Sequence, residues 1–204
     1  MRILIAFLTM FMLSGCYPLL TEGHYNTVET VPGEIKSLKK SDEQMKEDIR
    51  QIKDALGMMK TGMKQQITEK TASVEQLSPE TIQVTLQQKM LFKSGSSTIS
   101  AEGRKLLSHF AEGVRNAPEA ARVRVVGHTD ANPIGSELRA RYTDNWELSA
   151  ARAAAVARAL IWGENINPNR FHIEAGGAIA PVADNNSEEG RAQNRRIELF
   201  LENI

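Results

Sequence analysis

The chain has 204 residues, which is enough for one ordinary domain with extensions. Lys and Arg together number 25, and Asp and Glu also number 25, so the formal net charge is zero. This balance argues against a nucleic-acid-binding protein, because such proteins carry an excess of basic residues.

The N-terminus has the pattern of a secretory signal. Arg2 supplies a positive charge, and residues 3–13 are apolar except for Thr9. This run is shorter than the roughly 20 residues of a membrane-spanning helix, so it indicates a signal peptide at residues 1–15. Its last residues, Leu13-Ser14-Gly15-Cys16, resemble a lipobox and predict lipidation of Cys16. The alternative is an ordinary signal peptide before an unlipidated cysteine.

Two observations support an outer-membrane lipoprotein. Cys16 is the only cysteine in the sequence, and a lone thiol is unusual in an oxidising compartment. By resemblance to enteric lipoproteins, in which Asp after the cysteine favours the inner membrane, Tyr17 indicates the outer membrane. Lipid attachment with more than one chain anchors a protein stably. We therefore expect a lipid-anchored protein that faces the periplasm.

Residues 16–34 read as a flexible tether, because they contain prolines and glycines and lack periodicity. Residues 35–67 then predict a coiled-coil helix. The apolar residues on its seam are Ile35, Leu38, Met45, Ile49, Ile52, Leu56, Met59 and Met63. Three interpretations stay open: a homo-oligomeric coil, a coil with a different partner, and an amphipathic helix that packs on its own domain.

Residues 68–79 are rich in Ser, Thr, Glu and Gln and read as a second linker. Residues 80–204 predict a globular α/β domain. Alternating apolar residues indicate strands near residues 82–86, 171–175 and 197–201, and residues 122–126 read as a buried strand. Helices are expected after Ser100, which is a good N-cap, and over residues 145–162. One mixed sheet with helices on one face would follow.

Several segments of this domain resemble the peptidoglycan-binding family of OmpA, Pal and MotB. They are Leu91-Phe92-Lys93-Ser94-Gly95-Ser96, Val126-Gly127-His128-Thr129-Asp130, Asn145-Trp146-Glu147-Leu148-Ser149-Ala150-Ala151-Arg152-Ala153 and Gly190-Arg191-Ala192-Gln193-Asn194-Arg195-Arg196-Ile197-Glu198. The resemblance covers residues 80–202 and implies a βαβαβ fold that binds diaminopimelate of the peptide stem without catalysis. The residues it implies for this site are Asp130, Arg152, Asn145, Arg195, Thr129 and Leu148.

The sequence departs from the family pattern at two places. The segment 131–144 is longer than in OmpA and Pal and looks more like MotB. Gly95 stands where some relatives have an asparagine that touches the ligand, so a side-chain contact from this position is excluded.

The chemistry of two residues suits a zwitterionic ligand without the family name. Arg152 interrupts an apolar stripe of the helix formed by Leu148, Val156 and Leu160, where a charge is costly unless it is paired. An arginine can grip a carboxylate with two hydrogen bonds, and Asp130 can accept from an ammonium. The alternative is that Asp130 and Arg152 pair with each other. The first reading predicts a preference for diaminopimelate over lysine stems of at least about tenfold.

Other residues have structural alternatives. Asn145 is a good N-cap for its helix. His128 reads as a structural histidine after Gly127. One of Arg195 and Arg196 is expected at the site and the other on the solvated surface.

We therefore expect an outer-membrane lipoprotein that binds diaminopimelate-type peptidoglycan and tethers the membrane to the wall. An alternative is a component of an envelope machine, with protein partners assembled through the coil. An enzyme is not expected, because the sequence has no clustered metal ligands and no nucleophile motif. No cofactor, metal or nucleic-acid partner is predicted.

Overall fold

The computed structural model describes residues 22–93 and 95–203, with side chains from Gly33 onward. The predicted signal peptide, the lipidation site Cys16 and the first part of the tether lie outside the described residues. The chain divides into two compact units between Met45 and Lys46. Across the described part of the chain, no helix has the length and apolarity needed to cross a membrane.

The first unit contains the beginning of helix α1 (Glu22–Gly62), and the second contains the rest of the fold. The remaining helices are α2 (Lys64–Thr68), α3 (Gln88–Leu91), α4 (Ala101–Asn116), α5 (Ser136–Arg139), α6 (Asn145–Arg158), the π-turn η1 (Ala159–Gly163), the 3₁₀ turn η2 (Pro168–Arg170) and α7 (Glu188–Asn194). The strands are β1 (Ala72–Ser78), β2 (Thr81–Gln87), β3 (Arg122–His128), β4 (Phe171–Gly177) and β5 (Arg196–Glu202).

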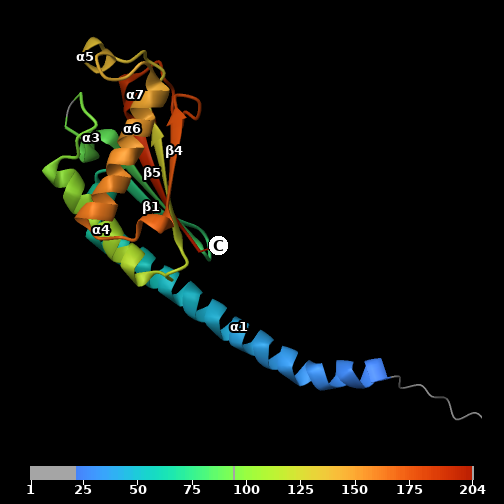
Figure 1. Cartoon of the computed structure of the whole chain (residues 1–204). Coiled ribbons are helices and arrows are strands. Elements are labelled where there is room, and N and C mark those ends of the chain that lie inside the picture. The colour runs from blue at the N-terminus through green and yellow to red at the C-terminus, as the bar shows by residue number, and fades with distance from the viewer. Residues whose placement is uncertain (1–21, 94, 204) are drawn as a thin grey trace, which may run out of the picture. The chain divides into compact units, whose positions relative to one another are not determined.

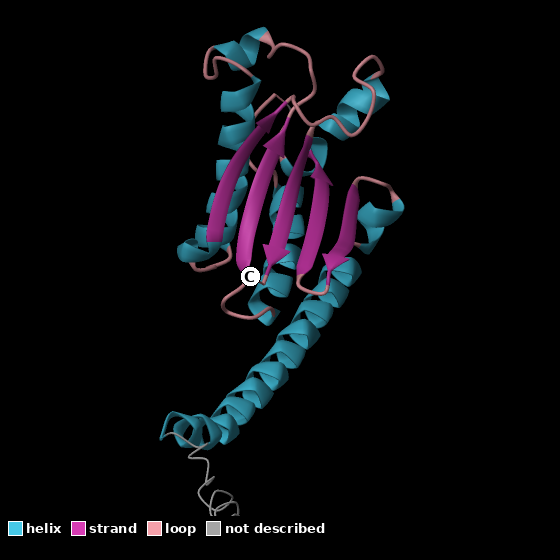
Figure 2. Cartoon of the chain, turned by 90° about the vertical axis from the view of Figure 1, so that its right-hand side faces the viewer, coloured by secondary structure: helices cyan, strands magenta, loops and turns pink. Residues whose placement is uncertain are grey.

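The strands form one mixed sheet in the order β1-β2-β5-β3-β4 (Figure 1). Only the β3–β4 pair is parallel, and α6 is the crossover between these two strands. The other three pairs are antiparallel. Helices lie behind the sheet in Figure 2. The predicted α/β fold with one mixed sheet is confirmed.

The core lies between the sheet and these helices. Alternate residues of β2 and β5 point into it, because side chains alternate across a strand. On α4 the apolar residues recur at helical spacing, and Ser100 caps the helix by accepting from the N–H of Gly103, as predicted. The buried residues of these elements are Ile82, Val84, Leu86, Ile197, Leu199, Leu201, Leu106, Leu107, Phe110 and Val114.

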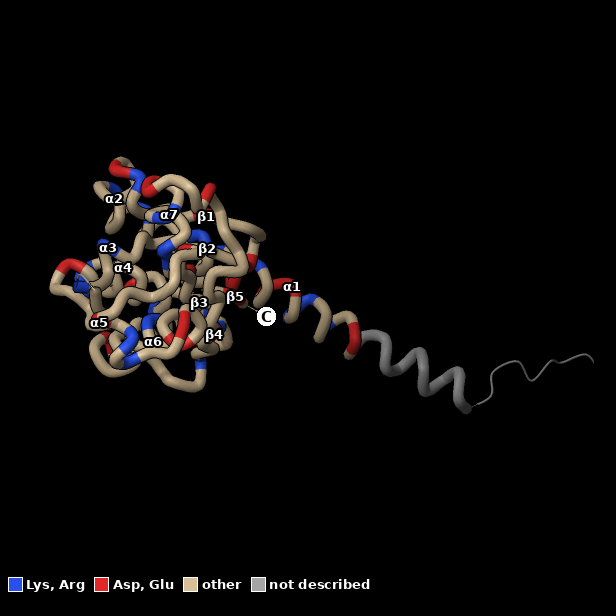
Figure 3. The backbone as a smooth tube through the Cα atoms, turned by 90° about the horizontal axis from the view of Figure 1, so that it is seen from above, with Lys and Arg blue, Asp and Glu red and all other residues tan. Residues whose placement is uncertain are grey.

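The opposite face of the sheet is polar. The guanidinium of Arg124 lies 3.8 Å from the ring centroid of Phe200 and pairs with Glu202 at 2.6 Å. Such pairs between neighbouring strands support the sheet on its solvated side. Basic and acidic residues are interspersed along the domain (Figure 3), which agrees with the balanced composition.

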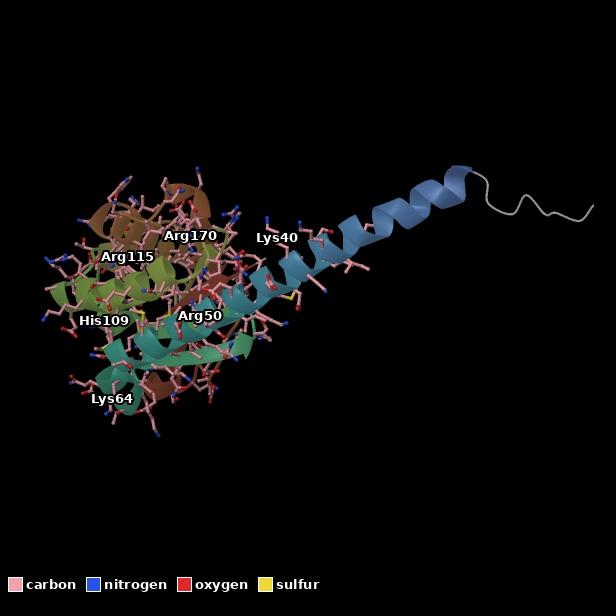
Figure 4. All side chains as sticks on the ribbon, turned by 90° about the horizontal axis from the view of Figure 1, so that it is seen from below. Lys40, Arg50, Lys64, His109, Arg115 and Arg170 are labelled. Atoms are coloured by element: carbon pink, nitrogen blue, oxygen red, sulfur yellow. The ribbon has the colours of Figure 1, made fainter. Side chains whose placement is uncertain are left out.

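The second half of α1 belongs to the core of the domain. Ile52 and Met59 of α1, and Met63 directly after it, are fully buried, and α1 lies beside α4, where His109 is labelled in Figure 4. For this half, the predicted coiled-coil seam is therefore an amphipathic face that packs on its own domain. Ile35 and Leu38 are exposed, and a coil there stays a prediction.

Two predicted boundaries are wrong. Residues 68–79 are not a linker, since they contain β1, whose Ala72 and Val74 are buried against β2 while its last four residues are exposed. The polar composition reflects an edge strand that is half exposed. The domain therefore starts at Lys46 rather than at residue 80. Residues 22–34 of the predicted tether are helical and belong to α1.

Candidate functional site

The candidate site lies at the end of the sheet where β3 finishes. The N–H of Thr129 donates to the carbonyl of Gly177 at 2.8 Å, which holds the residues after β3 against the end of β4. In Figure 1, α5, α7 and the start of α6 gather at this end. Charged side chains from several separate segments can therefore meet there.

Asp130 is 8% exposed and both of its carboxylate oxygens are hydrogen bonded. Oδ1 accepts from the N–H of Asn132 at 3.0 Å, and Oδ2 accepts from Nη1 of Arg195 at 2.6 Å. Nη2 of Arg195 donates to Glu188 at 2.6 Å. Burial lowers the pKa of Arg195, but Asp130 and Glu188 outweigh it and raise the pKa overall. Arg195 is therefore a cation held between two carboxylates.

Arg152 is a buried cation with a different environment. It is 4% exposed, and its Nη1 donates to the amide oxygen of Gln88 at 2.7 Å. Its guanidinium carbon lies 5.7 Å from the ring centroid of Phe92. Its Nε has no partner, and none of the described residues forms an ion pair with it. Arg152 thus keeps one buried hydrogen-bond donor, the Nε–H, without a partner among the described residues.

Burial lowers the pKa of Arg152 to about 10, and the nearby Tyr142 and Asp130 offset this effect only in part. The guanidinium therefore remains charged at neutral pH. A desolvated charge without a counterion is unfavourable, and an anion that reached it would be bound strongly.

The predicted alternative of a direct pair between Asp130 and Arg152 is wrong. Asp130 pairs with Arg195, and Arg152 bonds a neutral amide instead. The two groups remain close enough for Asp130 to raise the pKa of Arg152. The carboxylate of Asp130 and the guanidinium of Arg152 are thus present at one site without forming an ion pair with each other.

Asn145 is not the N-cap of α6. Asp144 caps the helix by accepting from the N–H groups of Trp146 and Glu147. The side-chain amide of Asn145 donates to the carbonyls of Asp130 at 3.3 Å and Asn132 at 2.9 Å. Asn145 therefore fixes the loop that carries the Asp130 carboxylate.

The remaining predicted site residues also lie at this end of the sheet. Thr129 is 5% exposed and its hydroxyl has no partner among the described residues. Leu148 is buried one helical turn before Arg152, as the apolar stripe predicted. The structure thus brings the predicted set together.

The sequence reading missed three residues at the site: Gln88, Tyr142 and Glu188. Gln88 binds Arg152, and Glu188 binds Arg195. Tyr142 exchanges a hydrogen bond of 2.7 Å with Ser97, which ties the long segment 131–144 to the loop after α3. No local signal marks Gln88 and Tyr142, because their partners lie 64 and 45 residues away in the sequence. Glu188 lies only seven residues from Arg195, but it falls outside the motif that identified this arginine.

His128 and Arg196 belong to a separate cluster. Arg196 is 4% exposed and bonds Glu198 at 2.8 Å, so its predicted place on the solvated surface is wrong. Nε2 of His128 lies 3.3 Å from Glu198. Burial raises the pKa of Glu198, but hydrogen bonds from His128 and Arg196 outweigh it and lower the pKa to about 2.

Gly95 has a structural reason to be glycine. Its φ of +61° lies in the left-handed region, where a side chain is strained. The absence of a side chain at this position therefore allows a tight turn in the loop near α5.

The fold and the site define the class of protein: an α/β domain with one mixed sheet and a charged site at the end of β3. Residues 91–195 match the OmpA family. Outer membrane protein A of Bordetella avium is 37% identical over 127 residues, which cover 62% of this chain and 61% of that protein. The probable lipoprotein YiaD of Escherichia coli is 34% identical over 124 residues, which cover 61% of this chain and 52% of that protein. The chain spans about half to three fifths of the length of these relatives.

A solved structure gives a fuller match. The cell wall anchor of the T6SS from Pseudomonas aeruginosa superposes with a TM-score of 0.63 at 34% identity. The match covers 71% of this chain and 96% of that one. Together with the family match, this fold and site place the chain in the OmpA family.

Proposed function

We propose that this protein is an outer-membrane lipoprotein that binds diaminopimelate-type peptidoglycan without cleaving it. The observation that carries the proposal is the buried guanidinium of Arg152, which forms no ion pair with any described residue and lies close to the buried carboxylate of Asp130. The free end of diaminopimelate carries an ammonium and a carboxylate on one carbon. The carboxylate of such a ligand would pair with Arg152, and its ammonium would pair with Asp130.

Each half of the ligand has a suitable partner. The ligand carboxylate would accept from the free nitrogen atoms of Arg152, as guanidinium and carboxylate pair with two hydrogen bonds. The ligand ammonium would donate to Asp130 and share that carboxylate with Arg195, which keeps its second bond to Glu188. The hydroxyl of Thr129, which has no partner in the described part of the chain, would be a further polar contact for the ligand.

The site would hold the wall while a lipid on Cys16 holds the outer membrane. The lipobox motif and the similarity to a probable lipoprotein of Escherichia coli support this anchor. Two attachments on one chain would make the protein a mechanical tether. Lipid attachment is tested by labelling cells with a fatty-acid analogue and comparing the wild type with Cys16→Ser.

A second candidate role is supported by one comparison. The structural relative from Pseudomonas aeruginosa is a cell wall anchor of the T6SS, and this chain covers nearly all of it. The same wall clamp could anchor an envelope machine, with the exposed part of α1 as the contact for a protein partner or a second copy. Removing residues 34–45, which spares the domain core, separates the two roles. General leakiness of the envelope supports the tether, and loss of one specific function supports the machine.

The binding proposal is tested by sedimentation with purified peptidoglycan. The chain should start at Tyr17 and keep residues 46–78, because they contribute to the core. We expect the wild type to sediment with diaminopimelate-type wall, and Asp130→Ala and Arg152→Met to remain in solution while folded. Equal sedimentation of all three would reject the proposed site. Released wall fragments would instead reveal an enzyme.

A further inference from the structure

Gln88 connects the two arginines of the site. It is the first residue of α3, and its backbone N–H donates to the carbonyl of Arg195 at 2.9 Å. Its side-chain oxygen accepts from Nη1 of Arg152 at 2.7 Å. This is the one hydrogen bond of the Arg152 guanidinium within the described part of the chain. Gln88 therefore orients the guanidinium through this bond.

The chemical type of this partner matters as much as its position. A carboxylate at the same place would form a buried ion pair with Arg152 and satisfy its charge internally. An amide oxygen is a hydrogen-bond acceptor without a net charge, so it orients the guanidinium and leaves the positive charge uncompensated. Arg195 shows the opposite arrangement, since two carboxylates hold it.

We propose that Gln88 is a specificity-determining positioning residue, which holds Arg152 with a neutral acceptor so that the carboxylate of the wall peptide becomes its counterion. This inference rests on the proposed function. It assigns the preference for diaminopimelate over lysine to a residue outside the matched family segment, which begins at residue 91.

The test is Gln88→Glu, with Gln87→Glu as the matched control. Both variants introduce the same charge at adjacent positions. The amide of Gln87 donates to the carbonyl of Lys70 at 3.2 Å. In the sheet, Gln87 pairs with Arg196. The control charge is thus placed away from Arg152. The probes are a soluble tripeptide that ends in meso-diaminopimelate and the same tripeptide ending in lysine.

For Gln88→Glu we expect affinity for the diaminopimelate peptide to fall by about tenfold or more, because the new carboxylate competes with that of the ligand. Affinity for the lysine peptide should not change. The Tm should rise by about 2–4 °C, since the buried cation gains a counterion. A merely structural role would lower the Tm and weaken both peptides alike. Gln87→Glu should bind as the wild type does.

The possible failures are distinguishable. If the wild type prefers the diaminopimelate peptide and Gln88→Glu keeps that preference, the role of Gln88 is overturned while the proposed function stands. If the wild type itself shows no preference, both the proposed function and this inference are rejected.

Discussion

Two buried arginines at opposite ends of the sheet have contrasting environments. Arg170, labelled in Figure 4, is 8% exposed, and its guanidinium donates to the carbonyls of Ala121 at 2.7 Å, Pro118 at 3.2 Å and Val114 at 3.3 Å. It ties the end of α4 to the start of β4. Arg152 is 4% exposed and has one hydrogen-bond partner within the described ranges, the neutral amide of Gln88.

The difference shows how to distinguish a structural charge from a binding charge. Burial lowers the pKa of both residues, so burial alone does not separate them. The distinction lies in the hydrogen bonds, because a guanidinium surrounded by carbonyls has its donors satisfied. A guanidinium with a free buried donor is suited to a ligand.

Replacing Arg170 should affect folding and not binding. Arg170→Met leaves three buried carbonyls without their donor, so we expect the free energy of unfolding to fall by about 3 kcal/mol or more. Urea denaturation measures this change. The folded fraction should still bind the wall with the affinity of the wild type. A variant as stable as the wild type would show that these hydrogen bonds contribute little.

Replacing Arg152 should have the opposite effects. Arg152→Met removes a desolvated charge and fills its space with an apolar side chain, so we expect stability to rise by about 1–2 kcal/mol. Wall binding should weaken by about 2 kcal/mol, roughly 30-fold, because the ligand carboxylate loses its partner. Denaturation and sedimentation of the same sample measure both. A loss of stability would mean that Arg152 is structural, as Arg170 is.

Arg196 provides a third case, a buried arginine with a carboxylate partner. The pKa of Glu198 is lowered from 4.5 to about 2 in the folded protein, so its contribution to stability is complete above about pH 5. It is lost as the pH falls through 4.5 towards 2. Stability curves of the wild type and Glu198→Gln should therefore be separated at neutral pH and converge in acid. Curves with a constant separation would contradict this pairing.

The smallest effect concerns Thr129, whose buried hydroxyl has no partner among the described residues. Thr129→Val keeps the shape and removes the hydroxyl, so stability should change by less than about 1 kcal/mol. If the hydroxyl contacts the ligand, affinity should fall by about threefold to tenfold. Titration with soluble muropeptide measures it. Unchanged affinity would place Thr129 outside the ligand contact.

The sequence predicted the elements whose periodicity is strong. The strand residues Ile82 and Leu199 and the Ser100-capped helix lie where their patterns placed them. The strand β1 was missed because only Ala72 and Val74 of its residues are buried. The sequence does not decide what the apolar seam of α1 packs against, since an apolar helix face fits its own domain as well as a second chain.

The sequence predicted which residues form the site but not which of them pair with one another. Motifs identified Asp130, Arg152 and Arg195, and the structure brings them together. That Arg195 rather than Arg152 pairs with Asp130 depends on how α7 and β5 approach the loop after β3. The partner Gln88 is 64 residues from Arg152 in the sequence. Such contacts follow from tertiary packing, which local patterns do not encode.

The proposed role of Arg152 is to receive a carboxylate from the wall with a guanidinium that has no counterion among the described residues. Its most direct test is calorimetric titration of the wild type and Arg152→Met with the peptide ending in diaminopimelate and its lysine counterpart. We predict that the wild type prefers diaminopimelate by at least about tenfold and that Arg152→Met binds both peptides equally weakly. A variant that retains the full preference for the diaminopimelate peptide would contradict this role, because another group would then be binding the ligand carboxylate.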